Sequence, residues 1–375
     1  MWFESYNSVY GRSANPYDVR RTPGGSSGGT SALVSAGAAP CGVTSDVGGS
    51  TRIPAFYNGL FGHKPTGGTV PNTRTVPVCE GARTRFCQIG PSTRHACDLM
   101  PMLRIMAGPL EAGEANAHDE RVDDRPGAGA HALSLGDAES FAHRGLRGLR
   151  VLNCNSVSGN TPLVSRRDPE LARAQRRVVA ALLEAGCEVV PLPCDIEMEL
   201  RAAFDIWSAM LSSGTGHMPF RDIIAEGKSP LWVVAELIKL LFARSEHTLP
   251  ALGLALVERV PEALPALSAE LEQRGQRLRT RLREALGDGV MLYPTLPTCA
   301  PLHDEPLWRI FDSGATSIFN VMELPVTAVP LGTSTGGLPL GIQVVANHGQ
   351  DHRSIGVALA LENANVAGWA PPCTK

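Results

Sequence analysis

The sequence predicts an α/β fold, and two observations lead to that prediction. First, residues 149–192 read as a strand, a helix and a second strand in succession, which is the unit that joins two parallel strands of one sheet. Second, 43% of the residues are hydrophobic and 19% are charged, a composition that can bury a sizeable core. The 375 residues suffice for one large domain or two ordinary ones.

The strand–helix–strand unit has clear boundaries. Residues 149–154 are expected to form the first strand and 188–192 the second. Between them, Asp168 and Pro169 supply an N-cap and a proline at the first helical position. Apolar residues then recur on one helical face, and Gly186 ends the helix. That face consists of Leu171, Ala174, Val178, Leu182 and Ala185.

The other elements follow from local patterns along the chain. Before the unit, we expect a helix over 30–37, a strand entering a loop over 43–50, a core segment over 57–66, a surface crossing over 67–88 and a helix through 98–107. Residues 111–147, with His118, His131 and His143, are expected to be a variable loop. After the unit, we expect helices over 197–286, strands at 290–295 and within 319–330 and 338–345, and a last helix over 354–362.

Composition excludes several classes of function. The net charge of −3 leaves no basic footprint for nucleic acid. The longest strongly apolar run, near 231–243, contains Glu236 and Lys239 and is too short to span a bilayer. Nine cysteines without a C-x-x-C pair argue against a disulfide framework or a structural zinc site, so reduced thiols in the cytoplasm are expected.

Two serine sites flanked by glycine carry most of the functional signal. Ser26 and Ser27 lie in Gly-Gly-Ser-Ser-Gly-Gly, and Ser50 closes Ser-Asp-Val-Gly-Gly-Ser. Glycine permits tight turns and close approach of a ligand to the main chain. The consecutive N–H groups of Val47, Gly48, Gly49 and Ser50 could converge on one oxygen as an oxyanion hole.

A single Gly-Gly-Ser-Ser-Gly-Gly segment is more often a flexible loop. Neither site ends in Gly-Lys-Ser/Thr, so a phosphate-binding P-loop is unsupported. Apolar sequence follows both sites, at 32–34 and 53–57, which is not typical of linkers. The pair therefore favours a structured site.

Three motifs together resemble the amidase signature family. They are Pro-Gly-Gly-Ser-Ser-Gly-Gly at 23–29, Ser-Asp-Val-Gly-Gly-Ser-Thr-Arg-Ile-Pro-Ala at 45–55 and Gly-Leu-Phe-Gly-His-Lys-Pro-Thr at 59–66, with 24 residues from Ser26 to Ser50. Their variants look most like the fatty-acid amide hydrolase type 2 branch and its bacterial relatives. The resemblance implies a single domain with a mixed, twisted central sheet covered by helices on both faces. It places the signature core at 11–66 and a variable helical cap for substrate choice at 197–286.

The resemblance also implies roles for individual residues. Ser50 matches the nucleophile, and Ser26 matches the bridging serine that follows a cis peptide bond, here after Gly25. Ser27 matches a neighbour in the same hydrogen-bond network. Asp46 and Arg52 match positions that support the loop. The implied chemistry is hydrolysis of a small-molecule amide or ester through an acyl-enzyme, with no metal or organic cofactor.

The lysine of the family's Ser–cis-Ser–Lys triad has no counterpart before Ser26 in this sequence. The four lysines are Lys64, Lys228, Lys239 and Lys375, and Lys64 matches a family position outside the triad. We favour the explanation that an N-terminal portion carrying the lysine is missing. The alternative is a natural short form without catalysis. Either would leave these 375 residues severely impaired as a hydrolase.

Two other functions remain open. One is the glutaminase subunit of a tRNA-dependent amidotransferase, although the continuation Gly-Gly-Thr-Val-Pro at 67–71 argues against that branch. The other is a non-catalytic remnant that keeps the pocket without the base. The sequence leaves the oligomeric state open, with a homodimer as one option.

Overall fold

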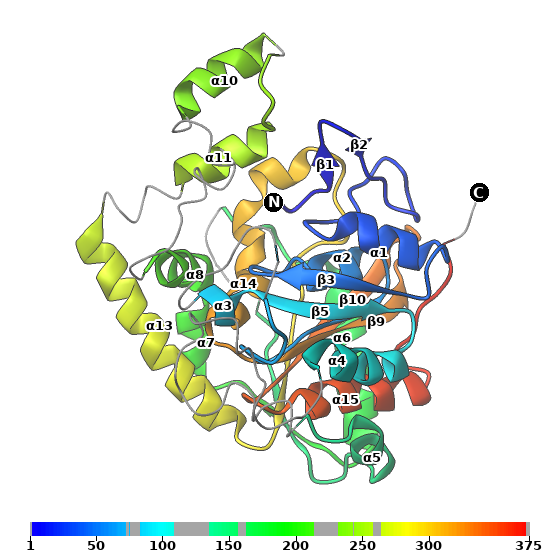
Figure 1. Cartoon of the computed structure of the whole chain (residues 1–375). Helices are drawn as coiled ribbons and strands as arrows, with labels where there is room; N and C mark the ends of the chain where they lie inside the picture. Colours follow the sequence, from blue (N-terminus) through cyan, green and yellow to red (C-terminus); the bar gives the residue numbers. More distant parts are fainter. Residues whose placement is uncertain are drawn as a thin grey trace.

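The computed structural model describes residues 2–72, 75, 83–108, 135–156, 163–213, 232–242, 244–257 and 264–372. Its centre is an eight-stranded sheet with the order β3-β5-β4-β9-β10-β8-β6-β7 (Figure 1). The strands are β3 Cys41–Asp46, β4 Phe61–Lys64, β5 Gln88–Thr93, β6 Arg150–Asn153, β7 Glu188–Pro191, β8 Val290–Tyr293, β9 Val326–Thr333 and β10 Pro339–Ala346. A separate two-stranded ribbon pairs β1 (Tyr6–Asn7) with β2 (Gly11–Arg12).

The sheet is mixed, as predicted. Neighbouring strands from β3 to β8 run antiparallel, whereas β6 is parallel to both β8 and β7. The predicted strand–helix–strand unit is β6, α6 (Pro169–Glu184) and β7. The Asp168 carboxylate caps α6 by accepting the N–H of Glu170 at 2.7 Å. That part of the prediction is confirmed.

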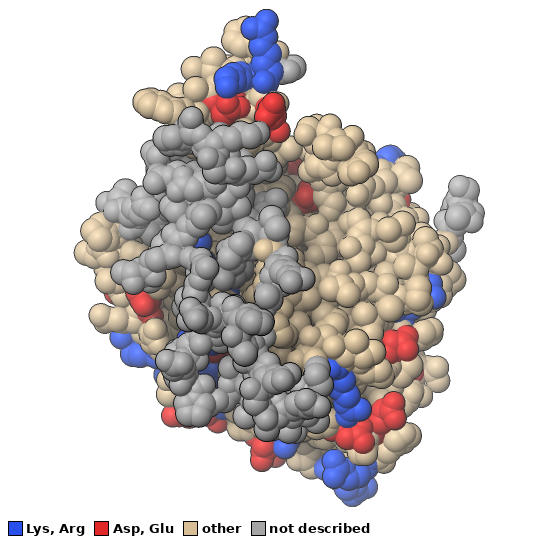
Figure 2. All heavy atoms as spheres, viewed as in Figure 1, with Lys and Arg blue, Asp and Glu red and all other residues tan. Residues whose placement is uncertain are grey.

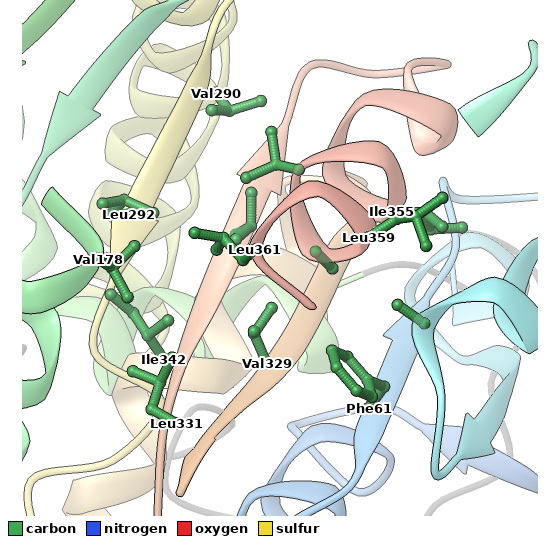
Figure 3. Packing of buried hydrophobic residues seen from close by; sticks show 14 of the residues in the cluster. Phe61, Val178, Val290, Leu292, Val329, Leu331, Ile342, Ile355, Leu359 and Leu361 are labelled. Carbon is green, nitrogen blue, oxygen red and sulfur yellow. The ribbon is translucent and has the colours of Figure 1, made fainter. Parts of the chain in front are cut away.

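Helices cover both faces of the sheet, and the side-chain alternation of each strand separates two cores. In β8, Val290 and Leu292 face one core, and Met291 and Tyr293 face the other. Figure 3 shows Val290 and Leu292 packed near Val178 of α6. Helices α4 (Leu99–Ala107), α6 and α15 (Asp351–Asn363) line the first core. Helices α7 (Cys194–Leu200), α8 (Ala203–Ser212), α13 (Pro265–Leu286) and α14 (Gly314–Val321) line the second.

The remaining helical elements are short or lie further from the sheet. They are α1 Gly28–Ser35, α2 Arg52–Tyr57, α3 Arg83–Phe86, η1 Ala96–Asp98, α5 Ala138–His143, α10 Val233–Leu241, α11 Leu249–Val257, η3 Glu305–Trp308 and η4 Ile310–Ser313. The prediction of helices over 197–286 is confirmed for its described residues. The predictions made for His118 and His131 fall outside the described residues.

Two predicted loops contain regular structure instead. Strand β5 begins at Gln88, where we expected the end of a surface crossing and then a helix start. The Gly90-Pro91 pair suggested a turn, but β5 lies between β3 and β4, and the Thr44 hydroxyl donates to the Gly90 carbonyl at 2.8 Å. Pairing on both sides outweighed local preference. Helix α5 lies within the expected loop at 111–147 because the Asp137 carboxylate caps it.

Helices α10 and α11 stand away from the sheet at the top of the view in Figure 1. They pack on each other through their own small cluster, which includes Val233, Leu252 and Ala255. On the face drawn in Figure 2, the charged side chains of the described residues are scattered, with a broad uncharged area between them. None of the helices in the described ranges is both long and apolar enough to cross a membrane.

Candidate active site

The first serine loop contains a cis peptide bond between Gly25 and Ser26, as the family resemblance implied. A Cβ on Gly25 would lie only 2.1 Å from the carbonyl oxygen of Trp2. The N-terminal segment therefore crosses this loop so closely that only glycine fits. Ser26 is exposed to solvent, and Ser27 directly precedes helix α1.

Ser27 joins the two serine motifs. Its hydroxyl oxygen lies 3.3 Å from the backbone nitrogen of Ser45 and 3.4 Å from the Ser45 carbonyl oxygen. Ser45 belongs to β3, which leads into the second motif, and Ser50 follows just before helix α2 with 9% of its surface exposed. Among the described residues, no hydrogen bond joins the Ser26 and Ser50 hydroxyls directly.

The second serine loop winds around the carboxylate of Asp46. Asp46 is fully buried and accepts the backbone N–H groups of Gly49 at 2.7 Å and Thr51 at 3.2 Å. The Arg52 guanidinium binds both carboxylate oxygens, at 2.9 and 3.0 Å. Burial alone would raise the pKa of Asp46, but Arg52, with help from Lys64, outweighs it and holds the pKa below its ordinary value. Asp46 therefore stays charged and fixes the loop.

Three residues distant in sequence complete this network, and sequence reasoning missed them. Arg52 also donates to the Thr316 carbonyl at 2.8 Å, to Asn320 Oδ1 at 2.7 Å and to Gln343 Oε1 at 3.1 Å. The Asn320 amide in turn donates to the Asp46 carbonyl at 2.8 Å. Thr316 and Asn320 lie on α14, every residue of which is buried. Polar side chains in an otherwise apolar segment were the signal that could have identified them.

The carbonyl groups of the loop are held by side chains from outside it. Trp207 Nε1 donates to the Val47 carbonyl at 2.9 Å, and the Thr316 hydroxyl donates to the Gly48 carbonyl at 2.8 Å. Gly49 has φ +120°, and a Cβ there would lie 2.2 Å from Thr316 Oγ1. The structure corrects one prediction here: the Gly49 N–H is directed at Asp46, so it stabilises the loop and does not face an oxyanion.

Lys64 is buried beside this network. It ends β4, is fully inaccessible, and donates from Nζ to the Pro65 carbonyl at 2.7 Å. Burial, and then repulsion from Arg52, lowers the Lys64 pKa to about 7 even though Asp46 opposes the shift. Lys239 instead lies on α10 and pairs with Glu236 at 2.6 Å. Lys228 and Lys375 fall outside the described residues.

Behind Lys64, the adjacent His63 contacts different partners. Its ring nitrogens lie 2.9 Å from Thr327 Oγ1 and 3.1 Å from Asp351 Oδ1. Burial lowers the His63 pKa, so the ring is neutral near pH 7. In the described parts of the chain, no three His, Cys, Asp or Glu side chains are placed to hold a metal ion.

Comparison with known proteins gives a consistent result. A model of the Amidase family matches residues 1–355. The chain is 40% identical to fatty-acid amide hydrolase 2-A of Danio rerio and 40% identical to fatty-acid amide hydrolase 2 of Homo sapiens, in each case over 99% of its own length. It spans 65% and 66% of the length of those two relatives. The solved structure of a glutamyl-tRNA(Gln) amidotransferase subunit from Thermotoga maritima shares the fold, with a TM-score of 0.71 and 22% identity over 98% of this chain and 73% of that one.

Proposed function

Because the chain belongs to the amidase family, we propose that it hydrolyses carbon–nitrogen bonds of carboxylic amides through an acyl-enzyme on Ser50. The observation that carries this proposal is the joined pair of serine loops. A cis bond shapes the loop of Ser26, and Ser27 links that loop to the strand that leads to Ser50. A serine nucleophile requires such a neighbour because its hydroxyl is weakly reactive by itself at neutral pH.

In the proposed reaction, Ser50 Oγ bonds to the amide carbon, and its proton passes through the Ser26 hydroxyl to a base. The tetrahedral intermediate then breaks the C–N bond as the leaving nitrogen takes up a proton. Water attacks the resulting ester, releasing the carboxylic acid and restoring the Ser50 hydroxyl. The backbone N–H groups of Val47, Gly48 and Ser50 are the proposed oxyanion donors.

Fatty-acid amides are the proposed substrate class, with aryl amides and esters as further candidates. The support is the 40% identity to two proteins named fatty-acid amide hydrolases. The glutaminase alternative has weaker support, since 22% identity to the amidotransferase structure concerns the fold alone. We further propose that the helices of 197–286 form a cap at the site within a single amidase domain, because Trp207 contacts Val47. The free thiols of the seven described cysteines fit the proposed cytoplasmic location.

Covalent labelling tests the nucleophile. The protein is exposed to a fluorophosphonate, and its intact mass is compared with those of Ser50→Ala and Ser45→Ala. Ser45 is a matched control because only its backbone contacts Ser27. We expect one adduct on the wild type and on Ser45→Ala, and none on Ser50→Ala.

A folded wild-type chain that takes up no adduct would support the non-catalytic remnant and contradict the proposal. If the adduct forms, turnover separates the two enzymatic candidates. Release of acid from a long-chain fatty-acid amide supports the proposed substrate class. Release of ammonia from glutamine alone would support the glutaminase.

A further inference from the structure

The indole of Trp207 rests directly on the second serine loop. Trp207 lies in α8, more than 150 residues from that loop in sequence, and only 9% of its surface is exposed. Its Nε1 donates to the Val47 carbonyl at 2.9 Å. A Cβ on Gly48 would lie 3.2 Å from the indole ring, so the ring covers the Val47–Gly48 peptide as well as binding it.

Other aromatic rings hold the indole in place. The Phe204 ring lies 5.6 Å from the Trp207 ring, and the Phe311 ring lies 5.0 Å from the Phe204 ring on its other side. Tilted and edge-on contacts at these distances are favourable for aromatic pairs. Because these neighbours restrict how the indole can turn, its N–H keeps its direction towards Val47.

The bond to Val47 also determines where the next N–H points. A trans peptide unit is planar, so its C=O and N–H groups point in opposite directions. Holding the Val47 carbonyl towards Trp207 therefore turns the Gly48 N–H away from α8. Glycine restricts its own backbone less than any other residue, so the Gly48 side of this peptide contributes little to its orientation.

We propose that Trp207 is a positioning residue that aims the Gly48 N–H at the oxyanion of the reaction. The inference rests on the proposed function, since it assigns this N–H to the intermediate formed on Ser50. Donors fixed before the reaction stabilise developing charge most effectively. Trp207 belongs to the helical region assigned to substrate choice, so that region also sets the geometry of the reaction.

A spectroscopic test reads the peptide without any need for activity. The sequence contains a single Val-Gly dipeptide, at 47–48. Labelling valine carbonyls with carbon-13 and glycine amides with nitrogen-15 therefore gives one correlated signal, from this peptide alone. In Trp207→Phe, which keeps an aromatic ring but lacks the N–H, the Val47 carbonyl resonance should shift. The matched control, Trp232→Phe, alters a tryptophan that is 77% exposed at the start of α10 and should leave the signal unchanged.

The kinetic readout is the rate of fluorophosphonate labelling at Ser50. Removing one oxyanion donor typically slows such reactions about 100-fold or more, so a donor that is misdirected should cost about tenfold or more. In turnover, kcat should fall while KM changes little, because the donor acts on the transition state. Placing benzothienylalanine at position 207 preserves the shape of tryptophan without the N–H. It should reproduce the loss even if Trp207→Phe is poorly folded.

An unchanged Val47 carbonyl signal in both position-207 variants would overturn the proposal. A shifted signal with an unchanged labelling rate would also overturn it, because the peptide would then move without consequence for the reaction. If the wild type is not labelled, the proposed function fails. The carbonyl signal then still decides whether Trp207 orients this peptide.

Discussion

The loop around Asp46 and the helix pair α10–α11 are built from opposite kinds of contact. In the loop, Asp46 and Arg52 are fully buried and bind partners from α14 and β10. In the helix pair, by contrast, large apolar side chains face solvent. These are Trp232, Val234, Ile238, Leu241 and Phe242. The loop has a single geometry imposed from several directions, whereas the helix pair is attached mainly to itself.

Two lysines show the same difference on a smaller scale. Lys64 is fully buried, with the Pro65 carbonyl as its hydrogen-bond acceptor. The side chain of Lys239 is 56% exposed and pairs with Glu236. A charge in the first setting is strongly affected by its surroundings, while a surface pair is screened and contributes little. Substitutions near Ser50 should therefore have large effects and those on α10 small ones.

Breaking the buried ion pair should have the largest effect. Arg52→Met leaves the Asp46 carboxylate buried without its cation, which typically destabilises a protein by about 3–5 kcal/mol. The measurement is the free energy of unfolding from urea denaturation, monitored by circular dichroism. Arg20→Met is the control, since Arg20 pairs with Asp18 on the surface with 78% of its side chain exposed. Equal, small losses in both variants would contradict the contrast between the two regions.

The buried lysine should make stability depend on pH. The Lys64 pKa is about 7 in the folded chain and about 10.4 when unfolded. Between these values the unfolded chain binds more protons, so this lysine makes the free energy of unfolding rise as pH increases from 7 to 10. Over that range the wild type should gain on the order of 4 kcal/mol relative to Lys64→Met.

Urea denaturation at a series of pH values measures this gain. Lys239→Met serves as the control, and its difference from the wild type should stay nearly constant with pH. A difference between wild type and Lys64→Met that does not change from pH 7 to pH 10 would mean that Lys64 is solvated in the folded protein.

The smallest effect is expected on α10. Leu241 is 83% exposed, so Leu241→Gln should change the free energy of unfolding by no more than about 0.5 kcal/mol. The same urea titration measures it. A loss of several kcal/mol would show that another part of the protein covers this face in solution, and would remove the contrast with the loop.

Much of the fold was predictable because its signals are local. Asp168 and Pro169 mark the start of α6, and the glycine–serine motifs mark the two loops. Strand β5 was missed because Gly90-Pro91 has the local preference of a turn, and only its two neighbouring strands explain its conformation. A single sequence read by local pattern cannot supply that information.

The site was predictable in the same limited way. Asp46 and Arg52 are six residues apart, and the resemblance identified both as supports. Trp207, Thr316 and Asn320 are each more than 150 residues from the loop they bind. No periodicity or spacing connects such distant positions. The direction of the Gly49 N–H depends on the path of the loop around Asp46, which also requires coordinates.

The partners of Arg52 have a consequence for biosynthesis. Arg52 leaves the ribosome early, whereas Thr316, Asn320 and Gln343 are translated near the end of the chain. Contacts between such distant positions form only after a large loop of chain has closed. A nascent chain that ends before residue 343 therefore carries both serine motifs without the groups that fix the loop of Ser50. The nucleophile should consequently become competent only when translation is nearly complete.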